Sequence, residues 1–415
     1  MNRGSVMPGP DALVRAGEAR ARAESIVTWL LEEERLRAAR TTALLDRFVQ
    51  RLLEAGLPLD RASLHIQQLH PQLAARSILW DSETGGAVEM GYEHSVRNRD
   101  AFLASPVKVI YEGGAPIRRH LEDPACPIDF PILAELTERA CTDYAIFPML
   151  FSGGATNAIS VATRRAGGFH DLDTAILDEV LPAFAAVLEL AQLRRTAREL
   201  LSTYVGPNTG ERILSGAVKR GDGEVIHAVL WYCDLRGFTA LSQTEPLGDV
   251  IALLNEYFDG VARPVAAHGG EVLKFIGDAM LAIFPCEATA AAVCSACDAA
   301  VTAAEVAVAS VAALNRARTA RGKAPVHCGV AVHVGDVMYG NVGAADRLDF
   351  TVIGPAVNLV NRLEHLCAEL DHPIVISADV ARGARRRFRP LGRHALKDIA
   401  EPQEVFTLAD GPVVV

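Results

Sequence analysis

The fold is decided first by residues 271–280, EVLKFIGDAM. This stretch predicts a strand, a tight turn and a second strand, because a type II′ turn takes glycine first and Gly277-Asp278 fits it. Asp278 would then be only a turn residue. Lys274 is harder to explain, because an unpaired ammonium inside an apolar strand is costly. Lys274 and Asp278 share a strand face but stand ~13 Å apart at ~3.3 Å per residue, so each needs another partner, such as a ligand or a second subunit.

The alternation of apolar strands and helical stretches extends over residues 224–410. Strands are expected at 228–233, 272–276, 279–284, 327–334 and 350–353, and helices at 246–266, 289–317 and 357–370. This order predicts a mixed sheet covered by helices.

Two further segments carry polar residues at element ends. In WYCDLRGFT, residues 231–239, a buried strand ends at Asp234 and a helix follows, so Asp234 taken alone fits a helix N-cap. In FTVIGPAVNLVNRL, residues 350–363, a strand leads into a helix. Asn358 and Arg362 are four apart on that helix and face the same way, which taken alone fits a surface pair.

Together the three segments resemble the signature segments of class III nucleotidyl cyclases, over about residues 224–410. The resemblance implies a ferredoxin-like α+β catalytic domain, in which the 3′-hydroxyl of ATP attacks its own α-phosphate and expels pyrophosphate. It also implies that Asp234 and Asp278 bind two Mg²⁺ ions, with Mn²⁺ as an alternative. One ion would lower the pKa of the hydroxyl, and the other would stabilise the leaving charge.

Lys274 and Thr351 match the two base-selecting positions of that family. A lysine can donate to a ring nitrogen of adenine, and a hydroxyl can accept from the exocyclic amine. Guanylyl cyclases typically have a glutamate and a cysteine or similar residue at these positions, so the resemblance favours ATP over GTP. With a threonine at this position, the chain resembles the subgroup of the family that includes bicarbonate-responsive cyclases. A response of this protein to bicarbonate is therefore a hypothesis. The more familiar residue of the family at the position of Thr351 is an aspartate. Asp349 lies two residues earlier on the same strand face, but its spacing to Gly354 does not match that position.

Asn358 and Arg362 match the pair that supports the transition state: Asn358 should orient the ribose and Arg362 should face charge on the α-phosphate. Lys397 matches a lysine that contacts the terminal phosphates, although Asp398 stands where a glycine usually follows. In the family the site lies between two catalytic domains. One catalytic domain here carries both sets of residues, which implies a homodimer with two equivalent sites.

The remaining chain is expected to comprise a flexible tail over residues 1–24, a small α+β domain over 25–189, and a helical linker over 190–223. A helix is expected from Ser25 to Glu54. Apolar runs that suit strands occur at 64–69, 77–80, 107–111, 145–151 and 158–163, and a helix capped by Asp173 follows.

Residues 25–190 resemble a GAF-type sensor domain, which implies a pocket for an unknown small ligand. The alternative is an empty pocket in a domain that only dimerises. The histidines in this part are expected to be surface or hydrogen-bonded residues: His65, His70, His94 and His120. Apolar residues at 3-4-3-4 spacing between Leu190 and Tyr204 predict a short coiled-coil seam, or else one amphipathic helix lying on a neighbouring domain.

Composition narrows the partners and the location. Lys and Arg number 41 against 51 Asp and Glu, a net charge of -10, so no nucleic-acid partner is expected. The richest apolar run, residues 288–314, is broken by Asp298 and Glu305, so no membrane span is expected. Residues 1–20 lack the apolar core of a signal peptide, and a cytoplasmic protein is expected. The alternatives to an adenylyl cyclase are a guanylyl cyclase and a catalytically silent relay protein.

Overall fold

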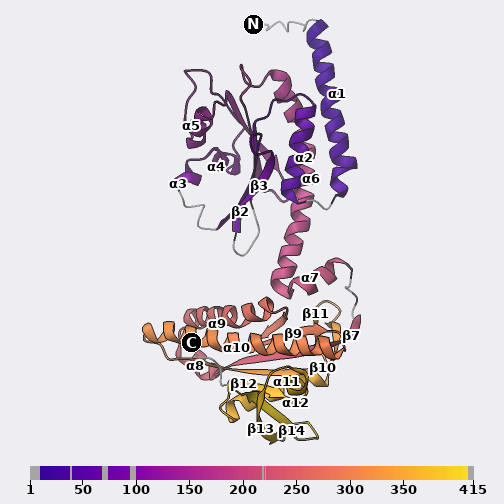
Figure 1. The fold of residues 1–415 in the computed structure, drawn as a ribbon. Coiled ribbons are helices and arrows are strands. Elements are labelled where there is room, and N and C mark those ends of the chain that lie inside the picture. Colours follow the sequence, from indigo (N-terminus) through magenta and orange to yellow (C-terminus); the bar gives the residue numbers. More distant parts are fainter. Residues whose placement is uncertain are drawn as a thin grey trace. The chain divides into compact units, whose positions relative to one another are not determined.

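The computed structural model describes residues 10–37, 40–67, 73–93, 100–216, 219 and 221–409. The chain divides into two compact units, Met1–Leu200 and Leu201–Val415. Each unit has its own sheet and its own hydrophobic core (Figure 1). The mixed α+β architecture expected from the sequence is therefore confirmed in both.

The N-terminal unit begins with helices, forms a sheet and ends in a long helix. Its elements are α1 (Pro10–Glu32), a 3-10 turn η1 (Glu34–Leu36), α2 (Thr41–Glu54), β1 (Arg61–Gln67), β2 (Leu73–Asp81), β3 (Gly86–Glu93), α3 (Asp100–Leu103), α4 (Pro106–Tyr111), β4 (Ile117–His120), α5 (Pro131–Glu138), β5 (Asp143–Leu150), β6 (Thr156–Thr163) and α6 (Asp171–Val205).

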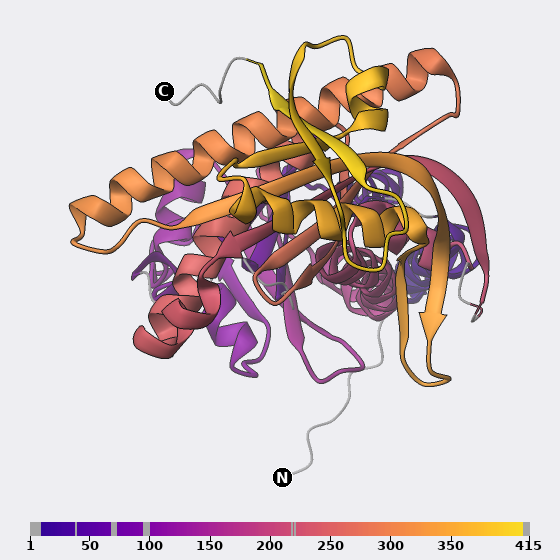
Figure 2. The same ribbon diagram turned by 90° about the horizontal axis from the view of Figure 1, so that it is seen from below.

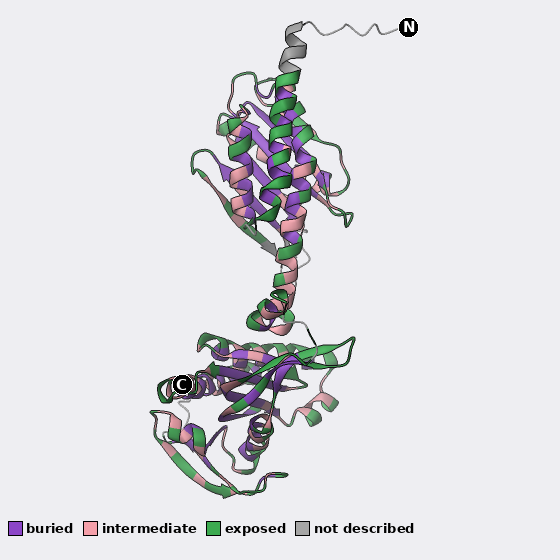
Figure 3. Cartoon of the chain, turned by 90° about the vertical axis from the view of Figure 1, so that its right-hand side faces the viewer, coloured by how far each residue is buried: buried purple, intermediate pink, exposed green. Residues whose placement is uncertain are grey.

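The six strands form an antiparallel sheet in the order β3-β2-β1-β6-β5-β4. One face packs on α1, α2 and α6 through residues such as Leu64, Phe48 and Phe184, and the rings of these two phenylalanines are stacked. The other face packs on α4 and α5 through a smaller cluster around Ile146 and Leu136. Buried residues therefore lie on both sides of the sheet (Figure 3).

The expected flexible tail over residues 1–24 is wrong for residues 10–24, because α1 begins at Pro10. Ala19, Ala23, Ile26 and Leu30 follow helical spacing, and all four are buried against the rest of the unit. The first buried positions of α1 are alanines, which give little hydrophobic contrast with the exposed residues around them. The helical pattern of apolar residues is therefore clear only nearer the end of the helix.

The helix expected from Ser25 to Glu54 is interrupted. Glu34, in η1, is buried, and Arg47 on α2 donates to it with a 2.9 Å bond from Nε. A buried carboxylate must be paired, so this contact fixes the break between α1 and α2. Leu44, Phe48 and Leu52 are buried on α2 as expected.

The apolar run 107–111 is helix α4 and not a strand. Ser105 caps it by accepting a hydrogen bond from the Lys108 N–H, and Pro106 occupies the first helical turn. Ser105-Pro106 is a sequence typical of the start of a helix. The β-branched residues that follow favour a strand, and the prediction relied on them.

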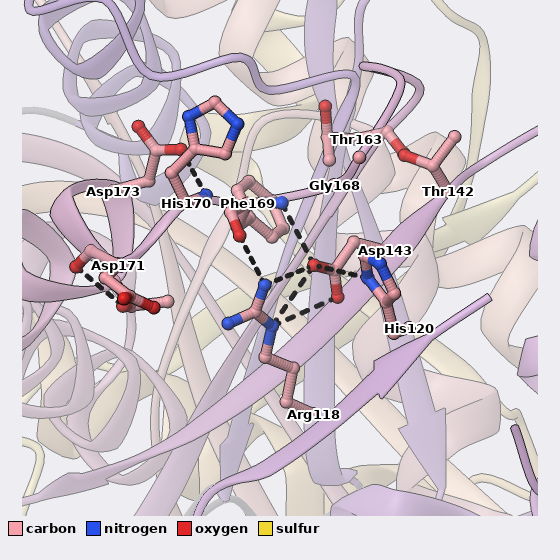
Figure 4. A network of polar contacts seen from close by, with 12 residues as sticks. Arg118, His120, Thr142, Asp143, Thr163, Gly168, Phe169, His170, Asp171 and Asp173 are labelled. Carbon is pink, nitrogen blue, oxygen red and sulfur yellow. Dashed lines mark hydrogen bonds and ion pairs between the residues drawn. The ribbon is translucent and has the colours of Figure 1, made fainter. Parts of the chain in front are cut away.

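A fully buried carboxylate, Asp143 at the start of β5, ties β4 to the loop between β6 and α6 (Figure 4). It accepts from Arg118 Nη2 at 2.6 Å, from the Phe169 N–H at 2.9 Å, and lies 3.3 Å from His120 Nδ1. Gly168 has φ +68°, and a Cβ there would lie 2.5 Å from Asp143 Oδ2, so only glycine fits this turn.

Helix α6 starts two residues before the expected cap, at Asp171. Asp173 instead accepts a hydrogen bond from the His170 N–H, as the third residue of a capping box does. The helix runs unbroken to Val205 and includes the expected seam. Leu193 and Tyr204 are exposed on it, and the coiled-coil pairing stays a prediction. His65 Nδ1 lies 2.9 Å from Ser77 Oγ, whereas His70 and His94 lie outside the described residues.

The C-terminal unit contains the elements expected between residues 228 and 370, and further elements before and after them that were not expected. Its elements are α7 (Pro207–Leu214), β7 (Gly223–Arg236), α8 (Phe238–Thr244), α9 (Leu247–Ala267), β8 (Glu271–Ile276), β9 (Ala279–Cys286), α10 (Ala290–Ala320), β10 (His327–Gly343), β11 (Leu348–Ile353), α11 (Pro355–Glu369), β12 (Ile374–Ser377), α12 (Ala378–Gly383), β13 (Phe388–His394) and β14 (Gln403–Leu408).

The strands form a mixed sheet in the order β13-β14-β12-β10-β7-β9-β8, with β11 paired to β10. The β10–β12 pair is parallel, and the other pairs are antiparallel. The central order β10-β7-β9-β8, with α9 and α10 as connections, is the β-α-β-β-α-β arrangement of a ferredoxin-like fold.

Helices cover both faces of this sheet. Helices α9 and α10 pack on one face, where Tyr257 and Val301 meet Trp231, and α11 packs on the other through Val360 and Leu363. Figure 2 shows α10 as a long helix lying beside the strands. Among the described residues, α10 alone has the length and apolar composition of a membrane span. Its buried residues belong to the core of this unit.

Candidate active site

Two aspartates meet where β7 ends and the β8–β9 turn begins. Cys233 pairs with Met280 in the β7–β9 register, which brings the next residue, Asp234, beside Asp278. Gly277 carries the positive φ of the turn, 65°, as a glycine-first turn requires. The Leu235 N–H donates to Asp234 Oδ1 at 2.8 Å. Asp278 lies in the expected turn. Asp234 lies inside β7, which continues to Arg236, and Gly237 is the N-cap of α8, so the N-cap interpretation of Asp234 is wrong. The sheet brings the two carboxylates together.

Burial, together with a hydrogen bond from Asp234 and the negative charge of that residue, raises the pKa of Asp278 to about 7. Two carboxylates in contact repel when both are ionised, so such a pair suits a bound cation. Hard oxygen donors fit Mg²⁺ or Mn²⁺. Among the described residues no group of three or more His, Cys, Asp or Glu side chains is placed to hold a metal. Ions held by this pair would need further oxygen ligands from a substrate or from water.

A third carboxylate, Glu364, was missed by the sequence analysis. It lies on α11 and is 5% exposed. Burial raises its pKa to about 7, and the charges of Asp234 and Asp278 act in the same direction. The sequence did contain a feature that could have indicated this residue: an acidic side chain at a core-facing position of an amphipathic helix, four residues after the buried Val360.

Lys274 finds a partner within its own unit. Its Nζ lies 2.5 Å from Oδ2 of Asp349 on β11, with the lysine side chain 27% exposed and the aspartate 59% exposed. Lys274 therefore has another partner, as expected, but this partner belongs to the same unit, and contact with a ligand or a second subunit stays a prediction. The pair joins residues 75 apart in the chain, and no local pattern indicated it.

Thr351 follows Asp349 on the same face of β11, because strand residues two apart point the same way. Thr351 is 6% exposed, and its Oγ1 is buried without a hydrogen-bond partner in the described part of the chain. Buried hydroxyls nearly always have a partner, so this oxygen is available to a ligand.

Asn358 and Arg362 lie on the side of α11 away from the sheet, opposite the buried Val360 and Leu363. Asn358 is exposed, and Arg362 Nη2 lies 3.6 Å from Asp398 Oδ2. Lys397 is exposed in the segment between β13 and β14. Asp398 has φ +63°, a conformation that glycine adopts without strain, which explains why a glycine suits this position.

The candidate residues predicted from the sequence thus fall into three groups: the acid pair, Lys274 with Asp349 and Thr351, and Asn358 and Arg362 with the Lys397 segment. No hydrogen bond or ion pair between described residues joins Arg362 or Lys274 to the acid pair; Arg362 pairs with Asp398, and Lys274 pairs with Asp349.

Comparisons with known proteins bear on the same part of the chain. A family model, the adenylate and guanylate cyclase catalytic domain, matches residues 225–405. Adenylate cyclase 1 of Rhizobium meliloti is 28% identical over 262 residues, 60% of this chain and 38% of that protein. An uncharacterized protein of Mycobacterium tuberculosis is 34% identical over 227 residues, 52% of this chain and 39% of that protein. This chain therefore spans less than two fifths of these relatives.

Among solved structures, the crystal structure of the adenylyl cyclase CyaB from P. aeruginosa is similar over 47% of this chain and 99% of that chain, with 25% identity and a TM-score of 0.42.

Proposed function

We propose that this protein, in which residues 225–405 form an adenylate and guanylate cyclase catalytic domain, converts ATP into cyclic AMP and pyrophosphate. The observation that carries the choice of ATP is the Lys274–Asp349 pair beside the buried, unpartnered hydroxyl of Thr351. The similarity to a protein named Adenylate cyclase 1 supports the same choice.

The chemistry of the two bases gives the reason. Adenine presents a ring-nitrogen acceptor beside an exocyclic amine donor. The ammonium of Lys274 can donate to the ring nitrogen, and the hydroxyl of Thr351 can accept from the amine. Guanine carries a donor at the corresponding ring nitrogen, which would face the ammonium. Leaving buried polar groups unpaired is a strong basis for rejecting a substrate.

In the proposed reaction the ribose 3′-oxygen forms a bond to the α-phosphorus, the bond between that phosphorus and pyrophosphate breaks, and the hydroxyl proton passes to solvent water. Asn358 orients the ribose, and Arg362 faces the negative charge that grows on the α-phosphate. Lys397 holds the terminal phosphates. Asp398, which pairs with Arg362 at 3.6 Å, would give up that pair when the triphosphate enters.

Asp234 and Asp278 would hold two divalent cations, Mg²⁺ or Mn²⁺. When bound, such ions lower the pKa of the attacking hydroxyl and offset the charge of the leaving pyrophosphate. The raised pKa of Asp278 supports this role, because a cation would relieve the repulsion that burial and Asp234 impose.

We further propose that the working form is a homodimer with composite sites. No hydrogen bond or ion pair between described residues joins Lys274 or Arg362 to the acid pair, and each chain carries all three groups. Exposed apolar side chains occur on the strands that bear the site: Phe275 and Ile276 on β8, Met338 and Val342 on β10, and Ile353 on β11. A second copy would cover this surface and bring an acid pair to a base-selecting group.

The finer regulatory proposals rest on the sequence. The N-terminal unit would act as a GAF-like sensor, with α6 as a paired helical linker that changes how two catalytic domains meet. Bicarbonate activation and a cytoplasmic location, with no nucleic-acid or membrane partner, are further proposals. The other functions that remain are a guanylyl cyclase and a catalytically silent relay protein.

One assay separates these functions. Purified protein is incubated with ATP or GTP, with Mg²⁺ or Mn²⁺, and cyclic product is quantified by mass spectrometry. Cyclic AMP from ATP, well above cyclic GMP from GTP, is expected. Cyclic GMP as the main product would establish the guanylyl alternative, and no product under any condition would favour the silent relay.

A further inference from the structure

A partly open cavity lies in the N-terminal unit, which contains none of the residues proposed for catalysis. It is on the face of the sheet that packs on α4 and α5, above β1, β5 and β6. Its volume is 180 Å³. This is below the ~300 Å³ at which pockets for drug-sized ligands begin, so a small molecule is indicated.

The floor of the cavity is polar. Arg61, Ser63 and His65 alternate along β1 and therefore point to the same face, whereas Ala62 and Leu64 point to the opposite core. Ser63 lies directly opposite Ser160 in the β1–β6 register. Polar side chains at inward strand positions are costly unless they meet polar partners.

One wall of the cavity is apolar. Pro106 and Val107 contribute from the start of α4, and Ile132 and Leu136 contribute from α5. The cavity therefore has a polar floor and an apolar wall, which suits a ligand with a polar head and a hydrocarbon body.

The charge in the cavity is positive. Arg61 is 17% exposed and donates to Glu135 through Nη1 at 2.6 Å, and its other N–H groups form no hydrogen bond with described residues. No carboxylate lines the cavity. Burial and the charge of Arg61 together lower the pKa of His65 to about 4, so the ring is neutral near pH 7. Arg61 is thus the single ionised group that faces a ligand.

We infer that this cavity binds a small aromatic or branched-chain carboxylate. Its carboxylate lies between the Arg61 guanidinium and the hydroxyls of Ser63 and Ser160, and its hydrocarbon body packs on Val107 and Leu136. The guanidinium matches a carboxylate in geometry and keeps its charge at all physiological pH values.

The test measures binding directly, so it does not depend on the proposed cyclase activity. The full-length protein is titrated by calorimetry with benzoate, 4-hydroxybenzoate and isovalerate, and with the corresponding primary amides. At least one carboxylate is expected to bind, and its amide to bind at least ~10-fold more weakly, because the charge-assisted bond is lost. Failure of all three carboxylates to bind at 10 mM, or equal binding by the amides, would overturn the inference.

Variants locate the site. Arg61→Gln is expected to weaken carboxylate binding at least ~10-fold, and Arg61→Lys is expected to retain part of it. Arg51→Gln, on α2 and outside the cavity, is the matched control and should bind as wild type. If Arg61→Gln does not fold, as judged by its melting temperature, Ser63→Val replaces it and should also weaken binding. Wild-type affinity in Arg61→Gln, or in Ser63→Val when it is the variant used, would contradict the inference.

Discussion

The Lys274–Asp349 pair makes a quantitative prediction about substrate affinity. Replacing Asp349 with Asn removes the charge that holds the Lys274 ammonium in place, 2.5 Å away. The aspartate side chain is 59% exposed, so solvent screens the pair and its contribution is discounted to ~0.5–1 kcal/mol. The KM for ATP should therefore rise about 2- to 5-fold, with kcat changed less, because the lysine acts in base recognition and not at the phosphates.

The assay measures initial rates of cyclic AMP formation over a range of ATP concentrations, with the same enzyme and metal concentrations for each variant. Asp346→Asn is the matched control, because Asp346 is an exposed acid in the loop between β10 and β11 with no described ion pair. Its KM should equal that of wild type. A KM for Asp349→Asn that is unchanged or lower would refute the view that Asp349 orients Lys274 for ATP.

Three further predictions test other residues. Arg362→Ala should lower kcat by ~100- to 1000-fold with little change in melting temperature, because a transition-state donor is lost; a loss under 5-fold would exclude that role. Asp398→Gly should raise the stability of the C-terminal unit by ~0.5–1 kcal/mol in urea unfolding, because φ is +63° there, whereas Ala400→Gly should not stabilise it. Burial lowers the pKa of His333 to about 4, although the charge of Asp379 acts in the opposite direction. Between pH 6.5 and 4 the unfolded chain therefore binds a proton at this histidine that the folded chain does not bind. Stability should therefore fall by up to ~3 kcal/mol as pH drops through that window, and less in His333→Gln; equal slopes would contradict the assignment.

Local patterns predicted most of the C-terminal unit, because its strands and helices are long and bounded by strong signals. Gly277-Asp278 marked the hairpin, and the residues after Gly354 marked the start of α11. What the sequence did not indicate depends on contacts between distant residues. Asp349 becomes the partner of Lys274 only when β11 folds back beside β8.

The N-terminal unit was harder to predict for a related reason. Alanines at inward positions of α1 gave a weak periodic signal, and the break after α1 depends on Glu34 reaching Arg47 on the next helix. The sequence did not indicate that Arg61, Ser63 and His65 line a cavity. Three polar residues at alternate positions of a strand normally indicate a surface that faces solvent.

The most direct test of a composite active site mixes two inactive chains. Asp234→Ala and Arg362→Ala proteins, carrying different affinity tags, are unfolded together, refolded at a 1:1 ratio, and assayed for cyclic AMP after heterodimers are confirmed by tandem purification. Each heterodimer would contain one site with both defects and one intact site, so random pairing should restore about a quarter of the wild-type activity. Heterodimers that are present and yet no more active than either parent would contradict a site shared between two chains.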